Sequence, residues 1–280
     1  MNDSITQKVV GIMLLLFSIT LLIPLIVSFL YSDGNHFTFI YSLITILVLG
    51  GLLYFPNRSA VSDIKIKEGF LIVVLFWVVL SLVGSIPFML DKQLSLSFID
   101  AFFESVSGWT TTGATIITNL DSLSPSILIY RQELQWLGGM GIVILALAVL
   151  PMLGVGGMKL YKAESTGPIK DNKISPRIAE TAQSLWSIYL GLTIACAALY
   201  YVAGMTAFDA IAHSFSTIAI GGFSTHNMSI GYYNNLYIET ICIFFMFISY
   251  QLPTAYFPKR KTIKDPKAEV NKITMKPEIR

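Results

Sequence analysis

The sequence predicts an all-α polytopic membrane protein, with two leading transmembrane helices followed by two similar repeats. Three observations support this fold class. First, the 280 residues are 54% hydrophobic and only 13% charged, whereas soluble domains carry about 25% charge. Second, several apolar runs reach the length of about 18 residues that a spanning helix needs. Third, two shorter apolar stretches recur at a fixed distance and divide the rest of the chain into equivalent units.

Six apolar runs are each long enough, or nearly so, to cross about 30 Å of hydrocarbon as a helix. The first run is too long for the core of a signal peptide and has no small-residue cleavage site, so we expect an uncleaved span. Two further stretches, 97–108 and 206–217, cover only about half of that thickness and are predicted to be re-entrant half-helices. The six runs are residues 9–31, 37–55, 69–90, 126–152, 182–203 and 235–252.

Basic residues indicate the topology. With a cytoplasmic N-terminus, the loops 55–68 and 153–181 and the tail after residue 252 contain sixteen of the nineteen Lys and Arg residues, as the positive-inside rule requires. This bias holds only if both half-helices enter and leave on the outer side, so charge supports re-entrance independently of length. The net charge of +2 is too small to indicate nucleic-acid binding. The expected surroundings are a lipid bilayer.

An internal repeat appears when the sequence is shifted by 109 residues. SFIDAFFESVSGWTTTGAT (97–115) then aligns with TAFDAIAHSFSTIAIGGFS (206–224). Each half-helix opens with a capping pattern, in which a hydroxyl residue precedes an aspartate by three positions, so we interpret both aspartates as caps and not as transport residues. The identical pairs include Asp100 and Asp209, Ala101 and Ala210, Ser105 and Ser214, Ser107 and Ser216, and Gly113 and Gly222.

The polar turn SGWTTTGAT (107–115) follows the first half-helix. Irregular backbone at membrane depth is tolerated only where it is buried in protein or lines a watery cavity. Aligned carbonyl oxygens can replace the hydration shell of a monovalent cation, and glycine permits the positive φ that such alignment needs. The second turn (216–223) keeps the glycine but has fewer hydroxyls, which favours carbonyls as the shared ligands. The alternative is a plain helix–helix turn packed against a neighbouring span.

Three blocks carry a resemblance to a known family: SGWTTTGAT (107–115), RQELQWLGGMGIVILALAVLPMLGVGG (131–157) and HSFSTIAIGGFSTHNMSIG (213–231). Over roughly residues 1–250, the chain resembles the TrkH subunit of the Trk/Ktr/HKT superfamily of potassium transporters. The resemblance implies a potassium-channel-like fold in which each repeat donates a pore helix and one filter strand. It implies no cofactor and no transition metal, with potassium as the substrate. The implied potassium-binding residues are Thr111, Thr112, Gly113, Ile220, Gly221 and Gly222.

The same resemblance implies low-affinity potassium uptake by symport across a bacterial inner membrane. It also implies a homodimer that binds a cytosolic nucleotide-binding gating-ring subunit, for which the loop 153–181 is a candidate contact. The expected organisation is two leading helices (1–67), a first pore repeat (68–158), a cytoplasmic linker (159–181), a second pore repeat (182–252) and a basic cytoplasmic tail (253–280).

The resemblance ends at about Ser249, after only two of the four repeats of the family. The remaining tail contains four prolines and eight basic residues, so we expect it to be largely disordered. A frameshift or early stop in a longer gene is the favoured explanation. Two chains related by a two-fold axis offer four filter strands. The alternative is a non-conducting truncated product that associates with full-length subunits.

Several polar residues lie near the predicted filter. Arg131, Glu133 and Gln135 begin the span after the first polar turn. We expect Arg131 to snorkel to the outer surface, and Glu133 to pair with it or face the outer vestibule, where attracting ions is a second role. Glu104 and His213 occupy equivalent positions in the two half-helices, and hydrogen bonding behind the filter is favoured there over direct ion contact.

An enzyme is the least supported alternative. The three histidines, His36, His213 and His226, have no second histidine or aspartate at a spacing that indicates a catalytic or metal site. Cys196 and Cys242 lie inside apolar runs and are interpreted as buried thiols, with no disulfide or metal pattern.

Overall fold

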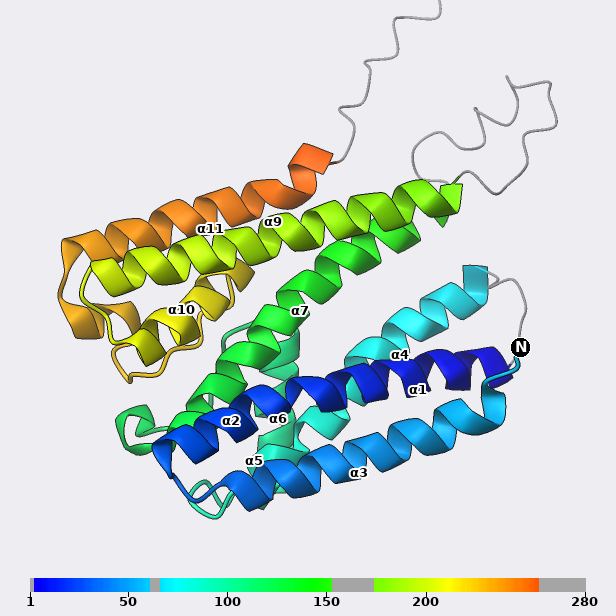
Figure 1. The fold of residues 1–280 in the computed structure, drawn as a ribbon, viewed down its shortest axis with the longest axis horizontal. Coiled ribbons are helices and arrows are strands. Elements are labelled where there is room, and N and C mark those ends of the chain that lie inside the picture. The colour runs from blue at the N-terminus through cyan, green and yellow to red at the C-terminus, as the bar shows by residue number, and fades with distance from the viewer. Residues whose placement is uncertain (1–2, 61–65, 153–173, 257–280) are drawn as a thin grey trace, which may run out of the picture.

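The computed structural model describes residues 3–60, 66–152 and 174–256, and this part of the chain is helical with no β-strand (Figure 1). The tail 257–280, expected to be disordered, and most of the linker 159–181 lie outside the described residues. The helices are α1 (Asp3–Thr20), α2 (Leu22–Tyr31), α3 (His36–Tyr54), α4 (Ile66–Gly84), α5 (Ile86–Leu90), α6 (Phe98–Trp109), α7 (Pro125–Met152), α9 (Ile174–Val202), α10 (Ala207–Ala219) and α11 (Leu236–Tyr256), with the short 3-10 helices η1 (Phe55–Asn57), η2 (Leu120–Ser122) and η4 (Ser229–Tyr233).

Each expected span is a helix or a pair of consecutive helices. The pair α1–α2 is interrupted at Leu21, three residues before the buried Pro24, and the pair α4–α5 is interrupted at Ser85, two residues before Pro87. Both breaks are explained by proline, which lacks an N–H group and whose ring clashes with the carbonyl four residues earlier. The helix α9 starts at Ile174, earlier than the expected span, and α11 continues to Tyr256.

Within the described residues, four helical segments are long and apolar enough to cross a membrane: Ser4–Tyr31, His36–Asn57, Gly69–Leu90 and Gln183–Val202. A fifth apolar segment, Leu236–Gln251, is shorter. Many large apolar side chains on these helices face outward; Leu30, for example, is 75% exposed. Because lipid is the solvent that favours such a surface, the arrangement agrees with the membrane fold that composition predicts.

The two half-helices are re-entrant. The helix α6 has 12 residues and α10 has 13, so each is about 18–20 Å long and too short to span a bilayer. The non-helical segments 110–115, after α6, and 220–224, after α10, are here called the first and second return strands. Asn35 donates hydrogen bonds to Asp91, before α6, and to Ser124, after the first return strand. Asn235, after the second return strand, donates to the carbonyl of Ala203, before α10. Each segment therefore starts and ends on the same side, as predicted.

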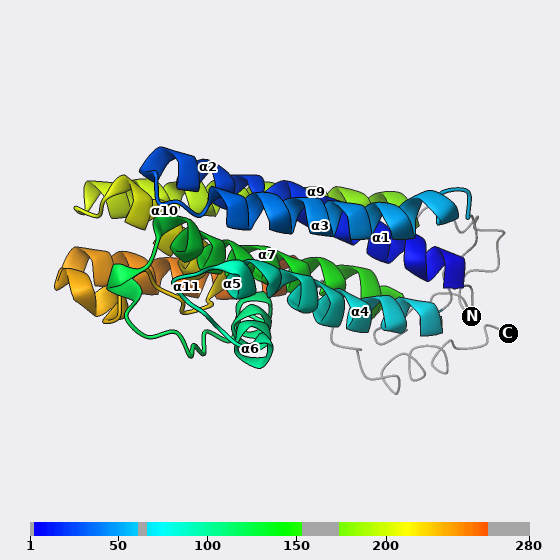
Figure 2. The same cartoon turned by 90° about the horizontal axis from the view of Figure 1, so that it is seen from below.

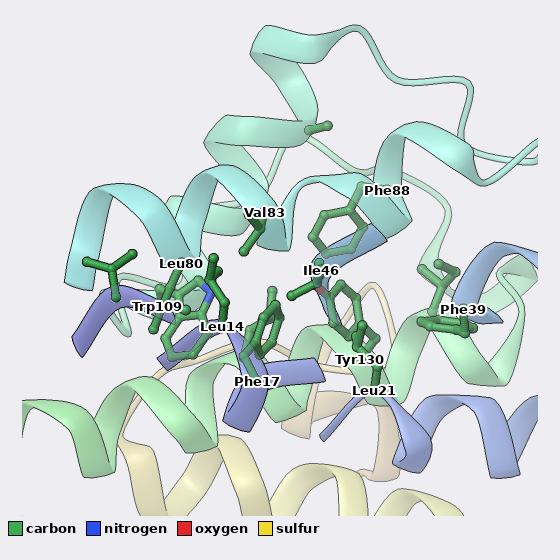
Figure 3. Packing of buried hydrophobic residues seen from close by; sticks show 14 residues of the cluster. Leu14, Phe17, Leu21, Phe39, Ile46, Leu80, Val83, Phe88, Trp109 and Tyr130 are labelled. Atoms are coloured by element: carbon green, nitrogen blue, oxygen red, sulfur yellow. The ribbon is translucent and has the colours of Figure 1, made fainter. Parts of the chain in front are cut away.

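The long helices run roughly along the long axis of the molecule, whereas α6 lies across it, and the start of α1 and α10 lie toward opposite ends (Figure 2). A first apolar core joins α1, α3, α4 and α7 to the end of α6, and Figure 3 shows its packing. In it, Trp109 packs edge-on against Phe17 with ring centroids 5.3 Å apart. A second core joins α7 to α9, α10 and α11 through Met140, Tyr189 and Tyr200. The helix α7 is shared by both cores and therefore connects the two repeats.

Candidate functional site

The N-termini of both half-helices carry the predicted caps. The backbone N–H of Asp100 donates to the Ser97 hydroxyl, which in turn donates to the Asp100 carboxylate at 2.7 Å. Thr206 and Asp209 repeat this arrangement at 2.8 Å. In α10 the Asp209 carboxylate also accepts a hydrogen bond from Thr225, beyond the filter strand. The Ser97 and Thr206 hydroxyls therefore satisfy free N–H groups of the first turn, and the aspartate carboxylates fix these hydroxyls at the start of each half-helix.

The C-termini of the half-helices end in the same hydrogen-bond pattern. The Thr112 N–H donates to the carbonyl of Ser107 at 3.0 Å, and the Gly221 N–H donates to the carbonyl of Ser216 at 2.8 Å. One residue earlier, the Thr111 N–H donates to the carbonyl of Gly108, and the Ile220 N–H donates to the carbonyl of Thr217. These pairs of bonds define a Schellman motif. Both helices therefore end in equivalent turns, and the chain turns back there.

The two return strands repeat the same backbone geometry. Thr111 and Gly113 have φ values of 54° and 74°, and their equivalents Ile220 and Gly222 have 54° and 88°. The strands also lie against each other, because a Cβ atom placed on Gly113 would collide with the carbonyl oxygen of Gly221. Glycine is required at 113 both by its positive φ and by this close approach. The structure therefore brings all the sequence-predicted filter residues into two adjoining strands.

One side of the two return strands is exposed in this structure. Thr112, Ala114, Ile220 and Gly222 are exposed, whereas Gly221 is buried against α7. The negative ends of both half-helix dipoles lie at the start of these strands. The exposed side is therefore formed by the backbone of the two strands, and residues 110–114 and 219–223 include no acidic side chain.

Behind the two return strands, Glu104 and His213 form hydrogen bonds with hydroxyl groups at equivalent positions of the strands. The Thr115 hydroxyl donates to the Glu104 carboxylate at 2.9 Å, and the Ser224 hydroxyl lies 2.9 Å from Nε2 of His213. Nδ1 of His213 lies 2.9 Å from the carbonyl of Asp209, which only accepts, so Nδ1 carries the hydrogen of the neutral ring. Both residues make hydrogen bonds behind the strands, as the sequence favoured, and neither replaces a filter carbonyl.

Arg131 corrects a prediction. Its side chain is fully buried and pairs with Glu104 at 2.8 Å, so it neither snorkels outward nor pairs with Glu133. The guanidinium also donates to the Thr115 hydroxyl and to the Ser224 carbonyl, both at 3.1 Å. Thr115 and Ser224 are equivalent positions of the two strands. The expectation failed because the partner of Arg131 lies on α6, where sequence spacing does not reveal it.

Gln135 is a functional candidate whose contacts the sequence did not predict. It lies one turn after Arg131 on α7 and is fully buried. Its side-chain amide donates to the Gly221 carbonyl at 2.8 Å and accepts from the Phe223 N–H at 3.0 Å. The available sequence signal was a pair of polar residues four positions apart in an apolar helix, which places both on one face.

Glu133 and Gln132 are also fully buried, but in the described part of the chain neither side chain has a hydrogen-bond partner. Thr20 lies beside the Glu133 carboxyl, although its hydroxyl donates to the carbonyl of Phe17. The vestibule position expected for Glu133 is therefore wrong, because the side chain packs at the interface of α7 with the leading helices.

The glycines of α7 allow close helix approach. A Cβ on Gly138 would collide with the carbonyl oxygen of Trp109, at the end of α6. A Cβ on Gly139 would lie 3.0 Å from that of Ala219, at the end of α10. These contacts show that small residues at 138 and 139 are needed for helix packing. The helix α7 thus touches the C-termini of both half-helices.

On the outer side, the loops after the two strands are joined. His226 donates to the Asp121 carboxylate at 2.7 Å, and the Asn227 amide donates to the same carboxylate at 2.6 Å. The hydrogen bond from His226 is the main reason that the pKa of Asp121 lies below its usual value. This aspartate partner of His226 is separated from it by 105 residues, which explains why local spacing gave no sign of it. Among the described residues, no group of three His, Cys, Asp or Glu side chains is arranged to hold a metal ion.

Comparison with known proteins identifies the family. The family model TrkH, described as a cation transport protein, matches residues 35–251, which is more than half of the chain. The chain belongs to the TrkH family. TrkH proteins are transporters and not enzymes, so the family expected from the sequence and the rejection of an enzyme are confirmed.

Individual TrkH relatives show the same relationship. The chain is 56% identical over 242 residues to the Trk system potassium uptake protein TrkH of Vibrio parahaemolyticus, covering 86% of this chain and 50% of that protein. It is 42% identical over 269 residues to the Trk system potassium uptake protein TrkG of Escherichia coli, covering 94% and 56%.

The crystal structure of the potassium transporter TrkH from Vibrio parahaemolyticus is similar in fold. The TM-score is 0.79 at 51% sequence identity, and the match covers 89% of this chain and 50% of that one. The fold class predicted from the sequence is therefore confirmed. The chain spans about half the length of the TrkH relatives it matches.

Proposed function

We propose that this chain contributes to low-affinity, Trk-type potassium uptake, with potassium ions passing along the backbone carbonyls of its two filter strands. The proposed ion-binding residues are Thr111, Thr112, Gly113, Ile220, Gly221 and Gly222. The observation that carries the proposal is the repeated backbone geometry, with positive φ at equivalent positions 111 and 113 and again at 220 and 222. Membership of the TrkH family supports potassium as the substrate.

The chemistry of the strands suits a weakly bound monovalent cation. Carbonyl oxygens replace hydration water without adding net charge, which allows an ion to enter and also to leave. The C-terminal ends of α6 and α10 add a negative dipole at the same place, worth about 0.3–1 kcal/mol each for a nearby cation. The buried carboxylate of Glu104, which accepts from Thr115 behind the first strand, is paired with Arg131. Ligation by neutral carbonyls is therefore better suited to ion conduction than to tight ion binding.

The proposal includes a bacterial inner-membrane location with the N-terminus in the cytoplasm. Lys8 donates hydrogen bonds to the carbonyls of Arg58 and Ala60, so the beginning of α1 and the basic loop after α3 lie at one end of the molecule. That end gathers positive charge, as cytoplasmic ends do. The homodimer, the nucleotide-binding gating ring, symport and the five-part domain organisation belong to the same proposal and follow from the family resemblance.

Uptake measurements test this function. The chain is expressed in cells that lack potassium uptake, and growth at low potassium and rubidium uptake are recorded. Serine at both Gly113 and Gly222 is expected to abolish the uptake that the unmodified chain supports, because both positions require positive φ. Gly231→Ser is the matched control, since a Cβ there meets nothing within 4 Å. Unchanged uptake and ion selectivity in the double variant would refute the proposed filter.

A second candidate is a non-conducting truncated product that associates with full-length subunits. The exposed faces of Thr112, Ala114, Ile220 and Gly222 favour it, because irregular backbone at membrane depth needs a protein or water-filled covering. Absence of growth rescue, together with co-purification with a full-length TrkH protein in the same membrane, supports this candidate. Rescue by the chain alone excludes it.

A further inference from the structure

Gln135 makes hydrogen bonds to the residues on either side of Gly222 in the second filter strand. Its amide nitrogen donates to the carbonyl of Gly221 and its amide oxygen accepts from the N–H of Phe223, so it binds the residues on both sides of Gly222. A side-chain amide with this pairing substitutes for a neighbouring backbone strand. Because the site is fully buried, both hydrogen bonds are shielded from water and their loss leaves unsatisfied polar groups.

The space that Gln135 occupies explains a difference between the two strands. A Cβ atom on Gly221 would collide with the Gln135 amide group. The equivalent residue of the first strand is Thr112, which is exposed and has no such neighbour among the described residues. Glycine at 221 is therefore required by the approach of Gln135, and not by a positive φ.

Arg131 extends the same contact along the strand. It binds the carbonyl of Ser224 and the hydroxyl of Thr115, one helical turn before Gln135. Its charge is balanced by Glu104 at 2.8 Å, and Gln135 is neutral. The two residues thus hold the second strand by hydrogen bonds without adding net charge beside the ion path.

The helix α11, the equivalent of α7 in the second repeat, lacks this pair. A shift of 109 residues places Thr240 and Phe244 at the positions of Arg131 and Gln135. Both are exposed, and Phe244 has no group that binds a peptide. In the described structure these contacts therefore come from α7; they bind the backbone of the second strand, whereas Arg131 meets the first strand through the Thr115 hydroxyl.

We infer that Gln135 is a selectivity-determining positioning residue: it fixes the peptide groups that flank Gly222 and thereby sets the distance between the filter carbonyls and the ion. This inference rests on the proposed function, because selectivity has meaning only for a chain that conducts. Gln135 acts through the backbone of the strand and does not itself bind the ion. The positions and field of the coordinating carbonyls decide between potassium and sodium, so a loosened strand discriminates less well.

The first test compares Gln135→Glu with Gln132→Leu in membrane vesicles. Glutamate keeps the size of the side chain and the acceptor for Phe223, but sets an oxygen against the Gly221 carbonyl. We expect the ratio of rubidium to sodium uptake to fall about tenfold, which corresponds to about 1.4 kcal/mol of discrimination. Gln132 is equally buried on the same helix without a hydrogen bond in the described structure, so its substitution leaves the ratio unchanged.

The second test measures the strand directly and does not depend on transport. Amide hydrogen exchange is followed at Phe223 and at its equivalent Ala114 in the purified chain. Gln135→Leu is expected to accelerate exchange at Phe223 by tenfold or more while leaving Ala114 unchanged, and Gln132→Leu is expected to change neither.

The outcomes separate the two proposals. If the unmodified chain takes up no cation, the proposed function fails, whereas exchange at Phe223 still decides whether Gln135 positions the strand. If exchange at Phe223 is unaffected by Gln135→Leu, the positioning role is overturned. If exchange accelerates but the rubidium-to-sodium ratio is the same in all variants, the role in selectivity is overturned.

Discussion

Thr111 and Ile220, which are 109 residues apart, both adopt a left-handed backbone conformation with the same φ of 54°. This conformation costs about 1–2 kcal/mol for a residue that is not glycine, and both residues are branched at Cβ. This conformation occurs at both positions because each half-helix ends in a Schellman motif, which needs a left-handed residue. Two different local sequences are therefore forced into one backbone geometry by the turn that follows each half-helix.

Relief of this strain gives the first prediction. Ile220→Gly is expected to leave thermal stability in detergent unchanged or raise it by up to about 1 kcal/mol, because the lost side chain is 37% exposed and the left-handed cost disappears. Ile218→Gly is the control, since that side chain is 2% exposed within the same half-helix. It is expected to lose about 3–5 kcal/mol. Equal losses in both variants would contradict the explanation.

The filter glycines are expected to differ in their tolerance of a methyl group. At Gly222, alanine meets only the Cα of Gly113 at 4.0 Å, so the cost is mainly that of positive φ, about 1–2 kcal/mol. At Gly113, alanine adds a collision with the backbone of Gly221 that no side-chain rotation relieves. Thermal unfolding should therefore rank Gly113→Ala well below Gly222→Ala. The opposite ranking would show that the strands are not in contact as described.

Two buried glutamates on neighbouring helices provide a matched comparison. Glu104→Gln is expected to destabilise the protein by about 3–5 kcal/mol, because it leaves Arg131 buried without a counter-charge. Glu133→Gln keeps the size of a side chain that has no ionic partner among the described residues, so we expect a change below about 1 kcal/mol. Denaturation of the two variants in the same detergent gives both values. A large loss for Glu133→Gln would reveal a partner for that carboxylate.

The turn between α2 and α3 is expected to confer acid sensitivity. Partial burial opposes ionisation of Asp33, but hydrogen bonds from the Ser28 hydroxyl and from the backbone of Ser126 and Asn35 outweigh it, and the pKa lies below its usual value. The resulting stability is present above the pKa of an unfolded aspartate, about 3.9, and is lost as the pH falls through the lower folded-state pKa.

Asp33→Asn should therefore be less stable than the unmodified protein at neutral pH, and in thermal melts this difference should shrink as the pH falls below about 3.9. A stability difference for Asp33→Asn that persists unchanged into acid would rule out this role for its ionised form.

Local signals predicted the architecture well. Run lengths distinguished spans from half-helices, and the ends of α6 and α10 lie within two residues of the expected ones. The Ser97 and Thr206 caps were predictable because capping involves residues only three positions apart. The breaks at Pro24 and Pro87 shorten individual helices without changing the spans.

Contacts between distant residues were not predictable in this way. Arg131 was expected at the outer surface because the sequence showed its depth along one helix but not the carboxylate of Glu104 on another. Gln135 binds Gly221 across 86 residues, and His226 binds Asp121 across 105. Hydrogen-bonding capacity was visible in the sequence in each case, whereas the partner was not.

The sequence by itself determined the membrane fold, the two-fold repetition, the capped half-helices and the glycines at 113 and 222, because periodicity, capping and positive φ are properties of short segments. Only the tertiary structure decided how the two strands are held. That depends on α7, which passes the C-termini of both half-helices and carries Arg131 and Gln135 to strands on either side of it in the chain. Such contacts require the packed helices, since no local pattern specifies which buried polar group meets which strand.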